Sequence, residues 1–513
     1  MTGRAWRAAW RAAGLAAGLA AVVGCGGEGE TPSSPAAGGV GVQTPNSPLV
    51  TIRVMFDTGS IDDPAGLEGL NALTALMIGR GGTESLSYEE LTATLYPWAA
   101  GIDVRADKEV TTVIGEVHVD HLEPFYAIFR DLIITPRMDE ADFARNRDFL
   151  TNAIVSGLRG NDDEELGKQA LNAMLYEGHP YEATEMGTEA GLTAITLDDV
   201  TAFHAARYTG DAVLVGVGGG YPDGFLERVE SQLAAALPAG DGASRVLPAP
   251  RMPEGHELLI VEKDAIATAI SIGVPIGITR ADDDFYPLMV ANSYLGEHRT
   301  FNGRLMNQMR GLRGLNYGDY SYIEHFIQDG GSTFPVPNIP RRQQYFSIWI
   351  RPVPHHNAAF ALRQAIRELA LLVDEGMREA DFEATREYLV NYANLHVQTT
   401  SRRLGYVMDS RFYGTDFFID EIRTRLDGLT VDDVNAAVRR HLQADDLAIA
   451  VVTRDAAAFR ETLLSGDPST VTYNTEVGEE ILAEDEAITT YPLAIDTDRA
   501  RVVPVEEMFR TVS

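Results

Sequence analysis

The sequence predicts an α+β protein made of two homologous units, each an antiparallel-rich sheet covered by helices. The main observation is an internal repeat: residues 138–143 have the pattern of residues 377–382, which lie 239 positions later. A second match, at an offset of 234, joins residues 196–200 to residues 430–434. Two long matches in the same order are hard to produce by chance, so we expect the two halves to share one fold.

Each half mixes short alternating apolar runs, typical of half-buried strands, with longer stretches of helical apolar spacing. In the first half, strands are predicted over residues 51–56, 101–117 (broken at the charged cluster 105–109) and 212–217. Helices are predicted there over residues 68–78, 120–134, 139–158, 163–176, 197–208 and 223–237. In the second half, strands are predicted over residues 257–262, 267–274 and 447–452.

The composition of the segments between these elements divides the chain into six parts. The parts are a signal segment at 1–25, a flexible tether at 26–48, an N-terminal unit at 49–237, a linker at 238–254, a C-terminal unit at 255–465 and an acidic tail at 466–513. The linker is rich in Pro, Gly and Ala. The tail is expected to pack against a unit or to run along it.

The first 25 residues have the features of a bacterial lipoprotein signal peptide. Three arginines precede an apolar run at 12–23, which is too short for a comfortable membrane span. The run ends in Val-Val-Gly-Cys, which resembles a lipobox, and Cys25 is the only cysteine of the chain. We therefore expect Cys25 to carry a lipid that anchors the protein to a membrane of the bacterial cell envelope, facing the periplasm.

The charge balance excludes one class of partner. The chain has 75 acidic and 42 basic residues, for a formal net charge of −33. Such a chain is repelled by phosphate backbones, so no nucleic-acid partner is expected.

Several stretches carry a resemblance to a known family. Residues 69–77, followed by Gly82 and Thr83, resemble a zinc helix with the pattern G-L-A-H-F-L-E-H-M followed by G-T. Residues 178–181 and 302–317 resemble later segments of the same proteins, the insulinase/pitrilysin/mitochondrial-processing-peptidase-like family of inverzincin metallopeptidases. The resemblance covers roughly residues 47–465. It implies two LuxS/MPP-like metallohydrolase units that form a clamshell around a peptide chamber.

The zinc motif of that family, H-x-x-E-H, is degenerate in this sequence. Its histidine positions fall on Ala72 and Leu76, and its glutamate falls on Ala75. The family's distal glutamate ligand falls near Asn152. Because a catalytic zinc needs three protein ligands and an open water position, this chain is expected to bind no zinc and to be inactive alone.

No other histidine arrangement compensates for this loss. None of the 11 histidines forms H-x-x-E-H or H-E-x-x-H; His118, His121 and Glu123 come closest. They lie where a predicted strand passes into a helix, and we interpret them as surface residues at a strand end.

Arg310 and Tyr317 match a different part of the family pattern. The resemblance assigns them to a pair that reaches across the chamber toward the zinc-bound peptide. A guanidinium can hold a carbonyl or carboxylate, and a phenol can donate a hydrogen bond to a developing oxyanion. The alternative is that Arg310 is an ordinary surface charge and Tyr317 an ordinary strand residue.

Three functions follow from this pattern. The first is a non-catalytic subunit of a heterodimeric zinc metallopeptidase, in which a zinc-bearing homologous subunit supplies the metal and this chain supplies substrate contacts. The second is a lipid-anchored pseudo-peptidase that binds extended peptides without catalysis. The third is an active enzyme with an unforeseen metal site.

Overall fold

The computed structural model describes residues 38–240, 245–328, 330 and 332–512. The signal peptide predicted at 1–25, the lipidation of Cys25 and the tether up to residue 37 lie outside the described residues. Within the described part of the chain, no helix is both long enough and apolar enough to cross a membrane.

The first unit is built on a five-stranded sheet with the order β1-β5-β2-β4-β3. Its strands are β1 (Val40–Gln43), β2 (Leu49–Phe56), β3 (Gly101–Ala106), β4 (Thr111–His118) and β5 (Val213–Gly219). Only β1 and β5 pair in parallel, and the other neighbours are antiparallel. Alternate side chains of β2, beginning at Val50, are completely buried on the face that the helices cover.

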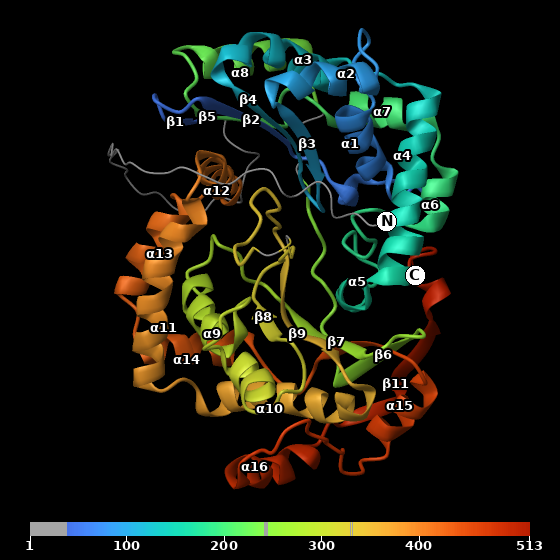
Figure 1. Ribbon diagram of the computed structural model, residues 1–513, viewed down its shortest axis with the longest axis vertical. Coiled ribbons are helices and arrows are strands. Elements are labelled where there is room, and N and C mark those ends of the chain that lie inside the picture. Colours follow the sequence, from blue (N-terminus) through green and yellow to red (C-terminus); the bar gives the residue numbers. More distant parts are fainter. Residues whose placement is uncertain (1–37, 241–244, 329, 331, 513) are drawn as a thin grey trace.

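Helices of the same unit cover the outer face of this sheet (Figure 1). Helices α1 (Leu70–Arg80), α3 (Leu122–Ile134) and α8 (Phe225–Ala236) contact its strands. Helices α4 (Glu140–Asn152) and α7 (Leu197–Arg207) pack on α1, and α6 (Glu189–Ala194) packs on α4. The remaining helix before α3 is α2 (Tyr88–Leu95). A π-helical segment, Ala153–Asn161, continues α4 and leads to α5 (Asp163–Leu175).

The second unit repeats this arrangement and extends it. Its sheet has the order β11-β6-β10-β7-β9-β8, in which the last five strands follow the order of the first sheet. The strands are β6 (His256–Glu262), β7 (Thr268–Ile276), β8 (Asp319–Tyr322), β9 (Gln344–Val353), β10 (Ala448–Thr453) and β11 (Ile495–Pro504). The helices are α9 (Phe285–Gly296), α10 (Ala358–Glu375), α11 (Glu379–Tyr392), α12 (Thr400–Tyr413), α13 (Phe418–Asp427), α14 (Val431–His441), α15 (Ala456–Leu464) and α16 (Glu479–Thr489). The predicted fold class, two homologous α+β units, is confirmed.

Four strands lie where the sequence predicts none: β8 and β9 within the C-terminal unit, and β1 and β11 in segments predicted to be a tether and a tail. β1 falls inside the predicted tether at 26–48, and it pairs in parallel with β5 as β6 pairs with β10. β11 falls inside the predicted acidic tail at 466–513 and adds a parallel edge to β6. Both segments are therefore integral parts of the sheets, because their backbone groups complete the hydrogen bonding of a neighbouring strand.

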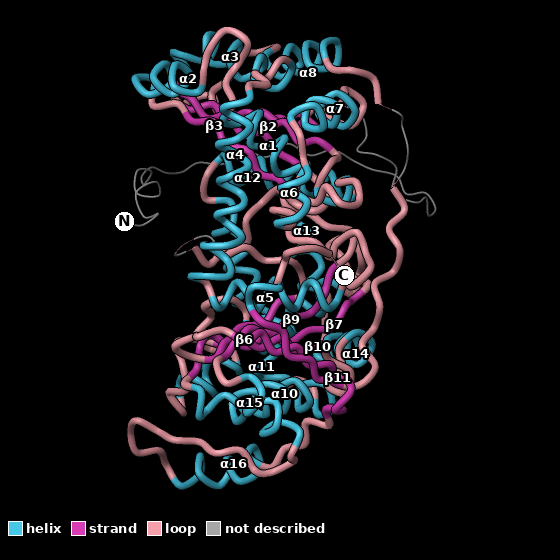
Figure 2. The backbone as a smooth tube through the Cα atoms, turned by 90° about the vertical axis from the view of Figure 1, so that its right-hand side faces the viewer, coloured by secondary structure: helices cyan, strands magenta, loops and turns pink. Residues whose placement is uncertain are grey.

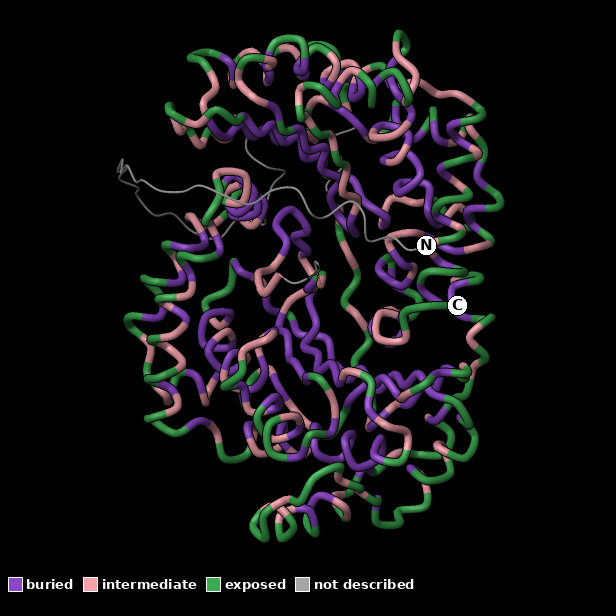
Figure 3. Tube along the Cα trace, viewed as in Figure 1, coloured by how far each residue is buried: buried purple, intermediate pink, exposed green. Residues whose placement is uncertain are grey.

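The two units exchange helices. α5 of the first half lies on the inner face of the second sheet, against β7 and β10, and α12 of the second half lies against β5 and β1 of the first sheet. The two sheets form separate layers with these helices between them (Figure 2). The central strands are buried, whereas the outermost helices carry many exposed residues (Figure 3). Glycine allows the close approach: a Cβ on Gly216 would lie 2.5 Å from Met408 Sδ, and one on Gly273 would lie 3.1 Å from Leu171 Cδ2.

The exchange predicts that a change in α12 destabilises the first unit. Leu404 is completely buried against Met55 and Leu214 of the first sheet. We expect Leu404→Ala to lower the free energy of unfolding by about 2–5 kcal/mol, since it leaves a cavity in this contact. Urea unfolding followed by circular dichroism measures the change. Leu482→Ala, at an exposed position of α16, is the matched control; an equal loss in both variants would contradict the prediction.

Candidate functional site

Helix α1, the counterpart of a zinc helix, is held at its start by a carboxylate. Asp63 accepts hydrogen bonds from the backbone N–H groups of Gly69 and Asn71, at 2.7 Å each. Gly69 has φ of 109°, and a Cβ there would lie 2.8 Å from Met186 O, so the position requires glycine. Burial raises the pKa of Asp63 to about 7, although these two hydrogen bonds oppose the shift.

Three of the four positions that the resemblance assigns to the ligands and the base lie on α1 and carry no ligand atom, and the fourth, on α4, is an asparagine. Ala72 and Ala75 are buried, and Leu76 packs against the same apolar cluster. Asn152 is exposed and ends α4. The polar side chain next to them, Asn71, is hydrogen-bonded to Thr111 on β4. The helix surface at these positions is therefore an apolar packing surface.

One group of possible metal ligands occurs among the described residues: Asp107, Glu185 and His325. Arg341 occupies it by donating Nε to Asp107 at 2.7 Å and Nη2 to Glu185 at 2.8 Å. Lys108 lies 3.3 Å from Glu185. Two cations already compensate the two carboxylates, and burial lowers the pKa of His325 to about 4. A divalent metal would have to displace both cations, so this donor set does not fit zinc.

The histidines that come closest to a motif in the sequence do not converge either. His118 Nδ1 accepts a hydrogen bond from the backbone of Asp120, and His121 stacks on Trp98 with ring centroids 5.4 Å apart. Glu123 is engaged by Arg228 at 2.7 Å. Each of the three has a structural partner.

Arg310 and Tyr317, in contrast, lie together. Arg310 is in a short π-helical turn, Met306–Gly311, and its guanidinium carbon lies 5.5 Å from the centroid of the Tyr317 ring. The Tyr317 side chain is 69% exposed. The structure thus brings these two predicted residues to one surface next to β8, an edge strand of the second sheet.

A residue that the sequence analysis missed holds this pair in place. Arg351 on β9 lies 5.3 Å from the Tyr317 ring centroid. Its backbone N–H donates to Gly318 O at 3.2 Å, and its carbonyl accepts from Asn316 Nδ2 at 2.9 Å. The residues on both sides of Tyr317 are therefore tied to β9. Arg351 in turn donates Nε to Glu164, at the start of α5, at 2.9 Å.

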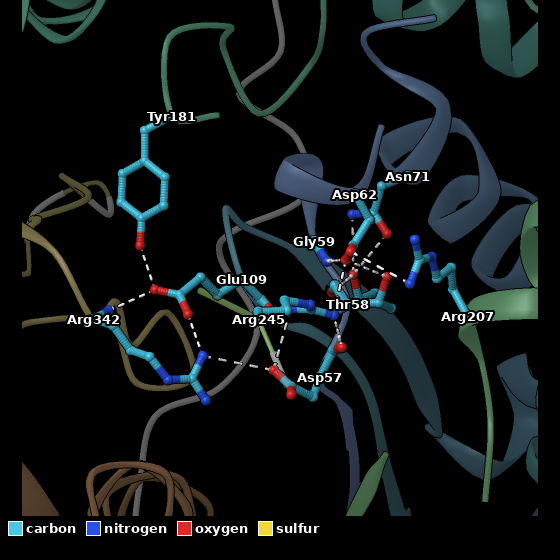
Figure 4. A network of polar contacts seen from close by, with 11 residues as sticks. Asp57, Thr58, Gly59, Asp62, Asn71, Glu109, Tyr181, Arg207, Arg245 and Arg342 are labelled. Atoms are coloured by element: carbon cyan, nitrogen blue, oxygen red, sulfur yellow. Dashed lines mark hydrogen bonds and ion pairs between the residues drawn. The ribbon is translucent and has the colours of Figure 1, made fainter. Parts of the chain in front are cut away.

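A polar network at the junction positions the two units relative to each other (Figure 4). Glu109, in the charged turn between β3 and β4, accepts hydrogen bonds from Tyr181 of the first unit and from the backbone of Arg342 of the second. Arg245, in the predicted linker, forms ion pairs with Asp57 at 3.2 Å and with Asp62 at 2.9 Å. The charged cluster at 105–109, which the sequence indicates only as a break between strands, is thus the contact point of the units.

Comparison with known proteins identifies the family. A family model described as "Insulinase (Peptidase family M16)" matches residues 40–189, and a model described as "Peptidase M16 inactive domain" matches residues 194–389. The chain belongs to peptidase family M16. The resemblance noted in the sequence is thereby confirmed.

Relatives and solved structures agree with membership of M16. The "Uncharacterized zinc protease YmxG" of Bacillus subtilis is 22% identical, over 81% of this chain and 96% of that protein. The "Mitochondrial-processing peptidase subunit beta" of Neurospora crassa is 22% identical, over 53% of this chain and 57% of that protein. A crystal structure of a "peptidase M16 inactive domain" from Pseudomonas fluorescens superposes with a TM-score of 0.71 at 22% identity, covering 81% of this chain and 96% of that one. The structural likeness supports the two-unit M16 fold.

The carboxyl group that caps α1 predicts a pH dependence of stability. The folded-state pKa of Asp63 is raised to about 7, whereas an unfolded aspartate titrates near about 3.9. The folded state therefore favours the protonated form of Asp63. The stability that this preference contributes is complete below the unfolded pKa and is lost as the pH rises through about 7. We expect the free energy of unfolding to fall more between pH 5 and pH 8 in the wild type than in Asp63→Asn. Urea unfolding at both pH values measures this, with Asp223→Asn at an exposed position as the control. Equal pH dependence in the wild type and Asp63→Asn would contradict the assignment.

Proposed function

We propose that this chain is the non-catalytic subunit of a heterodimeric zinc metallopeptidase of family M16. A homologous zinc-bearing subunit supplies the metal and the water, and this chain completes the peptide chamber and supplies Arg310 and Tyr317. The asymmetry between the halves supports the proposal: α1 offers only apolar side chains at the ligand positions, while the substrate-side pair lies together at an exposed surface.

The observation that carries the proposal is the state of Arg310. No hydrogen bond or ion pair joins its guanidinium to any other residue that the structure describes, and the guanidinium carbon lies 5.5 Å from the ring centroids of both Phe301 and Tyr317. A guanidinium that is half-buried yet unpaired is available for a carbonyl or a carboxylate of the substrate. The phenol of Tyr317, exposed beside it, is available as a donor to an oxyanion that forms at a partner's zinc.

The relatives favour a partner of the same family. The names of the bacterial relatives contain "zinc protease", and the Neurospora relative is named as a subunit of a processing peptidase. The expected partner is a zinc-bearing homologue, and the expected substrate is a peptide. The lipobox-like sequence ending at Cys25 supports a place for the complex in the bacterial cell envelope, with a lipid anchor and the chamber facing the periplasm.

A second candidate is the lipid-anchored pseudo-peptidase that binds extended peptides without chemistry. The edge strand β3 favours it, because β3 ends the first sheet, carries exposed residues and could be extended by a peptide strand, whereas the edge strand β8 of the second sheet is buried. The two candidates differ in whether a zinc-bearing partner gains activity from this chain.

Peptide cleavage by the reconstituted complex tests the proposal. This chain alone is expected to be inactive, and a mixture with a zinc-bearing homologue encoded beside it is expected to cleave peptides. Tyr317→Phe in the mixture should lower kcat by about 100- to 1,000-fold if the phenol donates to the oxyanion. Tyr96→Phe, at another exposed tyrosine, should leave kcat unchanged. Cleavage by this chain alone, or full activity after Arg310→Ala combined with Tyr317→Phe, would overturn the proposal.

Metal analysis gives an independent prediction. Because Ala72, Ala75 and Leu76 carry no ligand atom, and Arg341 occupies the one group of possible ligands among the described residues, the purified chain should hold no stoichiometric zinc after dialysis. Atomic emission spectrometry measures the content, with the zinc-bearing homologue prepared in parallel as the positive control. One zinc per chain would support the third function, an enzyme with its own metal site.

A further inference from the structure

The surface around Arg310 combines arginines with exposed aromatic rings. The arginine–aromatic patch consists of Arg299, Phe301, Arg310, Tyr317 and Arg351. Phe301 is 68% exposed and Tyr317 is 69% exposed. Arg310 lies 5.5 Å from both ring centroids, and Arg351 lies 5.3 Å from that of Tyr317. Arginine and large aromatic side chains are the residues that contribute most to binding at protein interfaces.

Positive charge in this patch exceeds the negative charge around it. Arg310 has no carboxylate partner among the described residues, and Arg299 donates only to the backbone oxygen of Gly330, at 3.1 Å. Arg351 alone is paired with an acid, Glu164, at 2.9 Å. The guanidiniums of Arg299 and Arg351 both lie near Tyr320. Burial raises the pKa of the Tyr320 phenol, and the positive charges of both arginines oppose that increase.

The acid beneath the patch does not restore the balance. Asp319 is completely buried at the start of β8, two residues after Tyr317. Its Oδ1 accepts from Asn316 Nδ2 at 2.7 Å, and its Oδ2 has no hydrogen-bond partner. Burial raises the pKa of Asp319 to about 8, so at neutral pH this carboxyl group is mostly protonated and adds little negative charge.

The negative charge of the rest of the chain limits which anions can bind at the arginine–aromatic patch. The chain as a whole has a formal net charge of −33, so an anion meets repulsion over most of the surface and attraction at these arginines. Polyanions with long phosphate backbones are disfavoured by the overall charge. A single carboxylate next to an apolar side chain matches both parts of the patch, because the guanidinium binds the carboxylate and the rings cover the apolar atoms.

We propose that the arginine–aromatic patch binds carboxylate groups of peptides, and that it gives this chain a preference for acidic peptides. Arg310 binds the carboxylate in a two-pronged hydrogen bond, Arg299 and Arg351 add positive potential, and Phe301 and Tyr317 pack on the neighbouring peptide atoms. The carboxylate belongs to an Asp or Glu side chain or to the peptide's C-terminus. The place of the patch in a peptide chamber rests on the proposed function, whereas peptide binding by this chain is measured without a partner.

Fluorescence anisotropy with the full chain and labelled peptides tests the inference. The probes are equal-length peptides: an amidated acidic one, its amidated Gln/Asn counterpart, an amidated lysine-rich one, and the Gln/Asn peptide with a free C-terminus. We expect a carboxylate-bearing peptide to bind about 10-fold more tightly than the amidated neutral peptide, the size of one charge-assisted pair. The preference should weaken as salt is added. Tighter binding of the acidic peptide assigns side-chain carboxylates, and tighter binding of the free C-terminus assigns the terminal one.

Variants connect the preference to the patch. Arg310→Gln should abolish the preference, while Arg310→Lys, which keeps the charge but not the planar fork, should retain part of it. Arg378→Gln, an exposed arginine paired with Asp381 on α11, is the matched control and should bind like the wild type. Circular dichroism confirms that each variant is folded.

Two results would overturn the inference: no preference for either carboxylate-bearing peptide, or an equal loss of preference in Arg310→Gln and Arg378→Gln. The outcome of these binding measurements is independent of the outcome of the cleavage assay. A carboxylate preference that depends on Arg310 supports the inference even if no zinc-bearing partner gains activity. Conversely, if the complex cleaves peptides in a way that depends on Tyr317, but this chain shows no preference for carboxylate-bearing peptides, the proposed function is supported and this inference is wrong.

Discussion

The reciprocal packing of α5 and α12 is the contact on which the rest of the molecule depends. Each sheet is covered on its outer face by helices of its own unit, and each would leave its inner face open to water. A helix from the other unit closes that face, so neither unit can bury its sheet alone. The glycines of β5 and β7 are what allow the helices to approach, because side chains there would meet Met408 or Leu171. One helix from each half thus makes a single body of two repeats.

The buried charges at the junction fix the orientation in which the two units pack against each other. Arg341 is only 1% exposed and is shared by Asp107 and Glu185, both from the first half. Removing water from such a group is unfavourable, so the pairing adds little net stability, but leaving one partner unmatched costs about 3–5 kcal/mol. The network therefore penalises any docking of the units other than the observed one. It gives Asp107 and Glu185 a structural role, since both carboxylates are paired with Arg341.

Much of this fold follows from local sequence, and the failures have identifiable causes. The strand predicted at 51–56 is β2, whose apolar residues alternate, and the helix predicted at 68–78 is α1, which is mostly apolar and buried. β1 was missed because it has only four residues and follows a pair of glycines, and its order comes from pairing with β5. β11 was missed because charged side chains interrupt it and only its backbone is needed to extend the sheet. Tertiary contacts, which one sequence does not display, decide both strands.

In the candidate site, too, residues within one sequence motif could be predicted, whereas a residue brought in by strand pairing could not. Arg310 and Tyr317 could be found because a motif with fixed spacing carries them. Arg351 could not, since it belongs to another strand and reaches Tyr317 only when β8 and β9 pair. Nothing in the sequence around Arg351 distinguishes it from other arginines. Its role comes from the register of the sheet and from Glu164, which the exchanged helix α5 delivers from the first half.

The cost of burying polar groups accounts for the difference between the ligand positions on α1 and the positions of Arg310 and Tyr317. Ala72 and Ala75 are almost fully buried on α1, so histidine and glutamate there would be buried polar groups. Without a metal to bind them, each would cost about 1–3 kcal/mol in lost hydrogen bonds to water. An apolar helix at this place is therefore the stable solution for a chain that holds no zinc. Arg310 and Tyr317 lie at the surface, where water solvates them and no such cost applies. The guanidinium of Arg310 is half-buried without an ion-pair partner, and the ring of Tyr317 is exposed, so no interaction with a carboxylate of this chain accounts for the position of either side chain.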